Sequence, residues 1–130
     1  MRIGELASKA GLNSSAIRFY EKAGILPRAF RQSGQRRFTD EAQLHLAVIE
    51  IARMAGFTIA EIRALFHGFE KRTPASTRWR RLAAKKDREM DLQIARLRSM
   101  QRLLRKSMRC RCMQLEDCGR ILLSRRGAGC

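Results

Sequence analysis

The sequence is poor in the features on which most enzyme sites depend. It contains only two histidines, His45 and His67, and neither lies near any of the four cysteines in the chain. No glycine-rich phosphate loop and no paired-carboxylate pattern is visible. We therefore do not expect an enzyme, and an enzyme that uses a reactive cysteine remains only a weak alternative.

Long apolar runs are also missing. No window approaches the ~18 consecutive apolar residues that a membrane-spanning helix requires. The opening residues include Glu5 and lack the apolar core of a secretion signal. We therefore expect a cytoplasmic protein. Its 130 residues suffice for one compact domain plus an extension, and the sequence contains no internal repeat.

Acidic residues are few compared with basic ones. The chain has 28 lysines and arginines against 12 aspartates and glutamates, which gives a net charge of +16. Such an excess predicts a polyanionic partner, with nucleic acid first and an anionic membrane surface second. Both parts of the chain are basic, +5 over residues 1–75 and +11 over residues 76–130. Bulk charge therefore does not identify the part that reads DNA.

The beginning of the chain has the pattern of two short helices joined by a turn. Gly11 ends the first, Ser14 or Ser15 is a plausible N-cap of the second, and Gly24 with nearby Pro27 ends it. The first helix has an apolar face formed by Ile3, Leu6, Ala7 and Ala10. Two such helices around a glycine turn predict a helix-turn-helix.

A basic hairpin and two further helices are expected next. Residues 28–38 combine a Ser-Gly turn with four arginines and flanking aromatic residues, which fits a small wing. A helix that begins near Thr39 has its apolar period at Leu44, Ala47, Val48, Ile51, Ala52 and Met54. Another, from Thr58 to about His67, has Ile59, Ile62, Leu65 and Phe66 on one face. We therefore expect a mainly α fold with a winged helix-turn-helix domain over residues 1–72.

A long polar helix is predicted over residues 76–108, about 50 Å at 1.5 Å per residue. Its apolar residues are too few for a buried helix and repeat at spacings of three and four, with Gln101 at one step. They are Met90, Ile94, Leu97, Leu104 and Met108. This is a coiled-coil seam, and a second copy of the chain is its simplest partner. A helix lying on a membrane is the alternative, but the narrow seam and mixed charges favour pairing.

The tail, residues 109–130, places Cys110, Cys112 and Cys118 within nine residues. In a reducing compartment such a group indicates metal-binding or redox-active thiols rather than structural disulfides. Neighbouring arginines favour the thiolate form, which is the metal ligand. Cys130 is either a fourth ligand or a free terminal thiol. His67 and Met113 are also possible ligands, although such residues more often serve packing.

Four stretches carry a specific resemblance to a known family. They are residues 3–7 (Ile-Gly-Glu-Leu-Ala), 17–26 (Ile-Arg-Phe-Tyr-Glu-Lys-Ala-Gly-Ile-Leu), 35–38 (Gln-Arg-Arg-Phe) and 56–62 (Gly-Phe-Thr-Ile-Ala-Glu-Ile). With the long helix, they resemble the MerR family of bacterial transcriptional regulators. The resemblance implies a homodimer with an antiparallel coiled coil, bound to two half-sites of promoter DNA. It also implies that RNA polymerase is activated by distortion of an overlong promoter spacer.

The resemblance also points to DNA-contacting residues. It implies that Arg18 and Tyr20 of the second helix face DNA, and we include Ser15 beside them. In the wing, phosphates would be held by Arg31, Arg36 and Arg37. The alternative is a solvated basic face, with Tyr20 and Phe38 as core aromatics and Ser15 as a cap.

Within that family the tail is similar to two kinds of sensor. The spacing of Cys110, Cys112 and Cys118 resembles SoxR-like members, whose tail holds a two-iron two-sulfur cluster with one further cysteine where this chain has Ser107. Cys110 and Cys118 alone resemble the loop of copper-sensing, CueR-like members. Sensors of divalent ions commonly add a cysteine near the start of the long helix, where this chain has Ser76 and Thr77. The alternatives are therefore a soft ion such as copper or zinc, an iron–sulfur cluster, or an architectural DNA-binding protein with a structural metal site.

Overall fold

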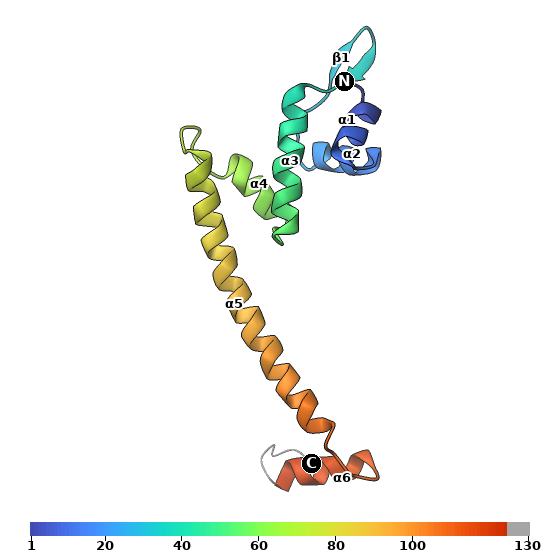
Figure 1. The fold of residues 1–130 in the computed structure, drawn as a ribbon, viewed down its shortest axis with the longest axis vertical. Coiled ribbons are helices and arrows are strands. Elements are labelled where there is room, and N and C mark those ends of the chain that lie inside the picture. Colours follow the sequence, from blue (N-terminus) through green and yellow to red (C-terminus); the bar gives the residue numbers. More distant parts are fainter. Residues whose placement is uncertain (125–130) are drawn as a thin grey trace. The chain divides into compact units, whose positions relative to one another are not determined.

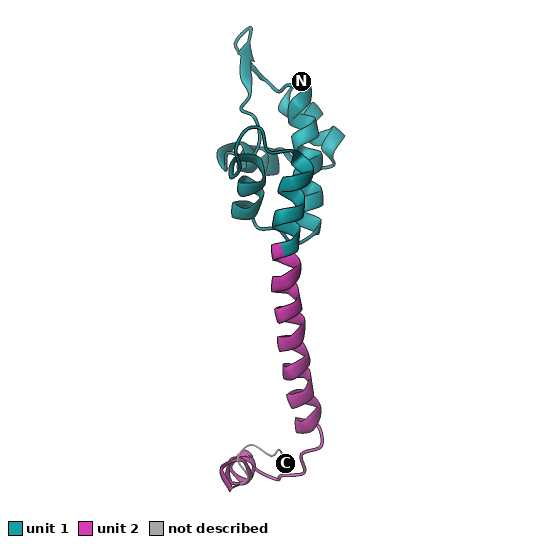
Figure 2. Ribbon diagram, turned by 90° about the vertical axis from the view of Figure 1, so that its left-hand side faces the viewer, with its two compact units in different colours: residues 1–84 teal, residues 85–130 magenta. Residues whose placement is uncertain are grey.

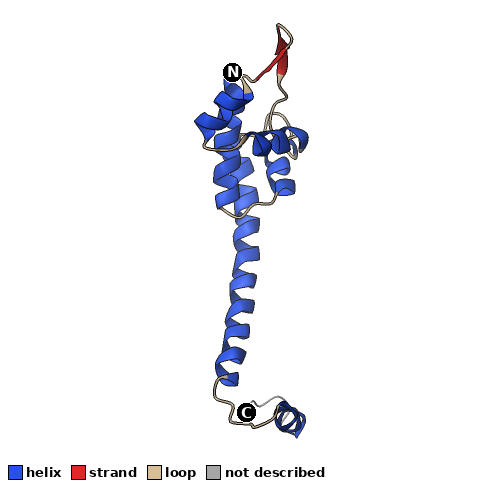
Figure 3. Ribbon diagram, turned by 90° about the vertical axis from the view of Figure 1, so that its right-hand side faces the viewer, coloured by secondary structure: helices blue, strands red, loops and turns tan. Residues whose placement is uncertain are grey.

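The computed structural model describes residues 1–124 and is mainly helical, as the sequence predicts (Figures 1 and 3). Cys130 lies outside the described residues. The elements follow the order α1 (Ile3–Ala10), α2 (Ser14–Lys22), β1 (Phe30–Gln32), β2 (Gln35–Arg37), α3 (Asp40–Met54), α4 (Ile59–His67), α5 (Ala75–Ser107) and α6 (Leu115–Ser124). They form two compact units, which divide between Ala84 and Lys85, so that α5 runs from one into the other (Figure 2).

Helices α1 and α2 form the expected helix-turn-helix. Gly11 ends α1 in the left-handed region at φ 68°, which a residue with a side chain rarely adopts. The predicted N-cap of α2 was wrong: the cap is Asn13, whose Oδ1 accepts a hydrogen bond from the Ala16 amide at 2.8 Å. Asn13 has the extended backbone of a cap residue, whereas Ser14 and Ser15 already lie within the first turn.

The wing is a two-stranded antiparallel hairpin in which Phe30 pairs with Arg37 and Gln32 with Gln35. Its two turn residues, Ser33 and Gly34, have positive φ values of 52° and 77°, as in the tight turns whose twist matches that of hairpin strands. Phe38 follows β2 and is 2% exposed. Its amide donates to the Met1 carbonyl oxygen, so the hairpin is held against the start of the chain.

The core of the first unit lies between α1, α2, α3 and α4, and its largest fully buried side chains are Leu6, Ile17, Ile25, Leu46, Ile49 and Ile62. The predicted apolar face of α3 was wrong in part. Leu44, Ile51 and Met54 are 69%, 59% and 82% exposed, whereas Ala42, Leu46, Ile49 and Ala52 are buried. Because α3 is apolar on several sides, periodicity alone could not select the buried stripe.

The first turns of α5 belong to the first unit. Trp79 and Leu82 pack partly buried against its core, and the Trp79 ring meets the Phe57 ring edge-on at 6.1 Å between centroids. The compact unit therefore reaches Ala84, while the domain limits that we predict at residues 72 and 76 stay predictions. From residue 1 to residue 124, no helix is long and apolar enough to cross a membrane.

The second unit contains the rest of α5 and α6. Its part of α5 buries no residue, and apolar side chains along it are exposed, among them Ile94, Leu97, Leu104 and Met108. Helix α6 was not predicted, although Glu116 and Asp117 in its first turn are well placed to stabilise a helix N-terminus. The short loop between the two helices carries Cys110 and Cys112.

Candidate nucleic-acid interface and cysteine cluster

Helix α2 presents polar side chains on an outer face. Ser15, Arg18 and Lys22 are exposed and are spaced by three and four residues, so they lie along one side of the helix. The opposite side carries Ile17, which is fully buried in the core. The helix therefore has one face fixed by packing and one free to meet a partner.

Tyr20 does not lie on that outer face, which corrects the expectation that it faces DNA. Its side chain is 2% exposed and belongs to the core, the alternative left open by the sequence. Its hydroxyl accepts a hydrogen bond from Arg53 Nη1 at 2.7 Å and donates to Glu50 Oε1 at 3.3 Å. Burial, and then the negative charge of Glu50, raise the pKa of Tyr20. Tyr20 thus joins α2 to α3.

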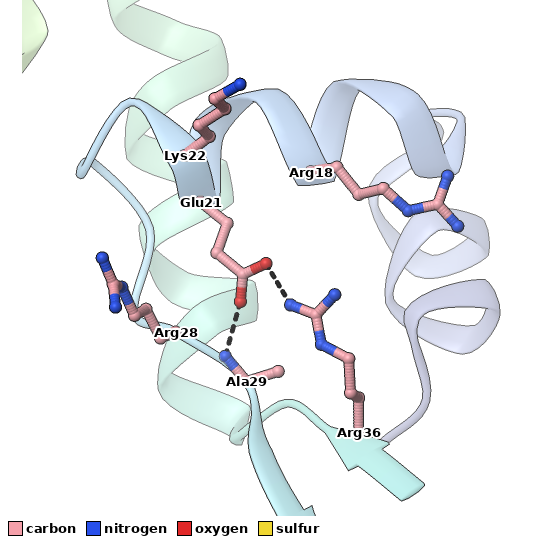
Figure 4. Close-up of a pocket in the computed structure, with 6 residues that line it drawn as sticks. All are labelled: Arg18, Glu21, Lys22, Arg28, Ala29 and Arg36. Carbon is pink, nitrogen blue, oxygen red and sulfur yellow. Dashed lines mark hydrogen bonds and ion pairs between the residues drawn. The ribbon is translucent and has the colours of Figure 1, made fainter.

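Glu21 joins α2 to the base of the wing (Figure 4). Its Oε2 accepts a hydrogen bond from the Ala29 amide at 2.6 Å, and its Oε1 accepts one from Arg36 Nη2. Burial disfavours the carboxylate, but the Ala29 hydrogen bond, the Arg36 guanidinium and the charge of Arg28 outweigh it, so the pKa of Glu21 is lowered. Glu21 therefore stays ionised and holds the hairpin against α2.

Four cationic side chains surround this carboxylate. Arg18 and Lys22 come from α2, Arg28 from the following loop and Arg36 from β2, and together with Glu21 and Ala29 they line one open pocket (Figure 4). The four positive charges exceed the single negative one. Such a basic concavity between a helix and a hairpin is suited to a phosphate group.

The other arginines of the wing differ in their surroundings. Arg31 is exposed near the turn and donates to the Gly34 carbonyl oxygen at 3.4 Å. Arg37 is half-buried, and its Nε is buried without a hydrogen-bond partner. Gln35 receives a hydrogen bond from Arg2 at 2.7 Å, which brings to the wing a cation that the sequence reasoning missed.

Helix α4 holds the end of α2 through two residues that the sequence did not single out for this role. Arg63 donates two hydrogen bonds to the Ala23 carbonyl oxygen, and His67 Nε2 lies 2.8 Å from the Gly24 carbonyl oxygen. These contacts link residues forty or more positions apart, which helical periodicity cannot reveal. They occupy His67, which does not belong to the cysteine cluster.

The structure brings Cys110, Cys112 and Cys118 together in the second unit. All three are half-buried, and their sulfur atoms lie within 4.8 Å of one another. The closest measured pair is Cys110 and Cys118, with 3.3 Å between the sulfur atoms. Within residues 1–124, no histidine or carboxylate belongs to this group, and Met113 is 94% exposed. Three sulfur donors this close fit the first shell of one soft metal ion.

Two family models match the chain. One is described as the MerR HTH family regulatory protein and covers residues 1–68. The other is described as MerR, DNA binding, and covers residues 44–106. Together they span the helix-turn-helix, the wing, α3, α4 and almost all of α5.

Relatives of known designation include both kinds of sensor. The heavy metal-dependent transcription regulator 2 of Rhizobium meliloti is 31% identical over 81% of this chain and 72% of its own. The regulator CueR of Salmonella typhi is 33% identical over 77% of this chain and 73% of its own. A SoxR homolog of Chromobacterium violaceum is 28% identical over 89% of this chain and 79% of its own. These relatives are transcription regulators and not enzymes.

A solved structure has the same fold over most of its length. A transcription regulator from Ralstonia metallidurans, crystallised in complex with lead(II), superimposes with a TM-score of 0.73 at 28% identity. The match covers 88% of this chain and 90% of that one.

Proposed function

The chain belongs to the MerR family of transcription regulators, and on that basis we propose that it binds promoter DNA as a homodimer and activates transcription when its cysteines bind a metal ion. The single observation that carries the DNA-binding part is the pocket in which Arg18, Lys22, Arg28 and Arg36 converge around Glu21. A protein with this function acts in the cytoplasm, where the promoter and RNA polymerase are found.

The proposed grip on DNA divides into phosphate contacts and base contacts. Arg31, Arg36 and Arg37 of the wing bind phosphates, while Ser15 and Arg18 on the outer face of α2 enter the major groove. Tyr20 fixes the orientation of α2 from the core through Arg53 and Glu50. Because Glu21 ties α2 to the wing, both sets of contacts move as one body.

The exposed stripe on α5 supports the homodimer. Ile94, Leu97 and Leu104 are 45%, 62% and 61% exposed in the single chain, at spacings of three and four residues. A second copy of the same helix buries this stripe in an antiparallel coiled coil and brings two winged domains to two half-sites. Activation then consists of a change in the DNA shape that the dimer stabilises, which brings the promoter elements into register for RNA polymerase.

The proposed effector is a soft metal ion bound by Cys110, Cys112 and Cys118, because three sulfur donors within 4.8 Å suit such an ion. The names of two relatives support a metal: one is heavy metal-dependent, and one was crystallised with lead(II). A two-iron two-sulfur cluster, the SoxR-like alternative, needs four protein ligands. In place of the further cysteine the chain has Ser107, whose hydroxyl donates to the Leu104 carbonyl oxygen at 2.6 Å.

The test of this function is metal-dependent transcription. The intact protein is used to select its binding sites from genomic fragments, and a selected promoter is transcribed in vitro with and without copper, zinc or lead ions. We expect at least one ion to raise transcript yield. Cys112→Ser should abolish this response and leave DNA affinity nearly unchanged. Loss of DNA binding in Cys112→Ser would mean that the cysteines serve folding, and an ion-bound protein without any response would be an architectural DNA-binding protein.

A further inference from the structure

The cysteine cluster is complete within one short segment of one chain. All three sulfur donors come from residues 110–118, and their sulfur atoms lie within 4.8 Å of one another. Cys110 lies just beyond α5, whose last turn is hydrogen-bonded to its amide through the Ser107 carbonyl oxygen at 3.1 Å. Cys118 is fixed within α6. Two helices thus set the positions of the two outer cysteines, and Cys112 lies in the loop between them.

The distances separate two ways of binding an ion. With a metal–sulfur bond of about 2.3 Å, two thiolates on opposite sides of one ion are about 4.6 Å apart, and three thiolates in a plane are about 4.0 Å apart. The sulfur atoms of Cys110 and Cys118 are 3.3 Å apart. A linear two-thiolate site would need this pair to open by more than about 1 Å, about twice the adjustment that a three-thiolate site needs. A third sulfur atom is already within reach.

We propose that the cluster binds one thiophilic ion through all three thiolates of a single chain, and that it selects an ion that accepts three sulfur ligands over one that prefers two in line. Lead(II) is an ion of this class. The inference rests on the proposed function and specifies the effector of the same site. It assigns Cys112 as an equal ligand, although the spacing of Cys110 and Cys118 alone would suffice for a two-thiolate loop.

The charge balance of the site agrees with this ligand set. A divalent ion that binds three thiols displaces three protons to solvent and leaves a complex with a net charge of −1. Arg109 and Arg111, which flank Cys110 in the sequence, offset that charge. A two-thiolate site would release two protons per divalent ion and leave a neutral complex. Proton release therefore counts the ligands independently of their geometry.

The experiment measures lead(II) binding by the reduced, full-length protein without oxygen or DNA. X-ray absorption at the lead edge counts the sulfur neighbours, and calorimetry in buffers of different ionisation enthalpy counts the protons released. We expect one ion per chain, three sulfur neighbours and nearly three protons. Cys112→Ser should leave two sulfur neighbours and weaken binding more than about 100-fold, because loss of an outer-shell partner already costs 10- to 100-fold.

Cys130→Ser is the matched control, since it also removes one thiol from the tail. It should leave sulfur count and affinity unchanged. The inference is overturned if Cys112→Ser keeps the wild-type sulfur count and affinity, if Cys130→Ser loses a sulfur neighbour, or if one ion is shared between two chains. A protein that binds promoter DNA but shows two sulfur neighbours would refute this inference alone. Three sulfur neighbours in a protein that does not bind DNA would refute the regulatory function alone.

Discussion

Arg63 of α4 donates two hydrogen bonds to the Ala23 carbonyl oxygen at the end of α2, from Nε at 3.0 Å and from Nη2 at 2.8 Å. Carbonyl groups at a helix C-terminus have no partner within the helix, and a cation there also stabilises the helix dipole. His67 lies one turn further along α4 and reaches the next carbonyl, that of Gly24. Helix α4 thus fixes the end of the helix that we propose to read DNA.

Loss of this link should destabilise the first unit. Because Arg63 is exposed, we expect Arg63→Met to lower the free energy of unfolding by only about 1 kcal/mol. Arg63→Lys, which keeps the charge but cannot donate twice in the same geometry, should fall between. Urea unfolding measures the effect, with Arg81→Met on α5 as the control. Equal stability of the Arg63→Met and wild-type proteins would show that the two hydrogen bonds do not hold α2.

The Glu21 carboxylate should make stability depend on pH. Its pKa is lowered from 4.5 in the folded protein, so ionisation favours folding. This contribution is fully present above the unfolded pKa of 4.5 and is lost as the pH falls through the lowered folded value. Glu21→Gln should therefore be less stable than wild type by about 1–3 kcal/mol at neutral pH, and the difference should shrink in acid. Unfolding measured over this pH range checks the sign; a difference that grows in acid would contradict it.

Tyr20 should affect stability more than DNA binding. Tyr20→Phe keeps the buried ring but removes the hydroxyl between Arg53 and Glu50, and we expect a loss of about 1 kcal/mol. Tyr20→Ala also empties the space of the ring and should cost about 3–5 kcal/mol. Thermal unfolding with a DNA-binding titration on the same samples measures both effects. If Tyr20→Phe left stability intact and abolished binding, Tyr20 would contact DNA directly.

Arg18 should show the reverse behaviour. It is exposed on the outer face of α2, so Arg18→Ala should leave the unfolding free energy within about 0.5 kcal/mol of wild type. Its affinity for a selected DNA site should fall by about 1–3 kcal/mol if it contacts a base. Binding titrations at several salt concentrations distinguish a phosphate contact, since its loss lowers the salt slope by about 1. Arg81→Ala serves as the control and should bind normally.

The stripe on α5 can be tested with two exposed leucines. Leu97 lies in the predicted seam, whereas Leu92 lies outside it, and they are 62% and 73% exposed in the single chain. Leu97→Glu should weaken or prevent dimerisation, because it places a charge in a buried seam. Leu92→Glu should remain dimeric. Analytical ultracentrifugation measures this, and a Leu97→Glu protein that dimerises like wild type would place the interface elsewhere.

Local signals in the sequence were sufficient for much of the fold. Gly11, the basic hairpin and the residues of the long helix predict the elements that the structure contains, because each depends on neighbours a few positions apart. The buried face of α3 could not be chosen, since Leu44 and Leu46 are equally apolar and only the packing of α1 against α3 separates them. Helix α6 was overlooked despite the acidic first turn that indicates it.

The candidate sites were predicted to a similar degree. The spacing of Cys110, Cys112 and Cys118 predicted a thiol cluster, and the structure gathers the three sulfur atoms. The links from Glu21 to Ala29 and from Arg63 to Ala23 join separate elements, so they appear only once the chain has folded. The core position of Tyr20 depends in the same way on α3, which supplies Glu50 and Arg53.

The most direct test of the central claim is the shape of the promoter DNA within the complex. Fluorescence energy transfer between dyes on either side of the bound site would be measured before and after the effector ion is added, at protein concentrations that keep the site occupied. We predict that the ion changes the transfer efficiency while the dimer stays bound, and that Cys112→Ser removes the change. An unchanged efficiency with the ion bound to the wild-type protein would contradict the account.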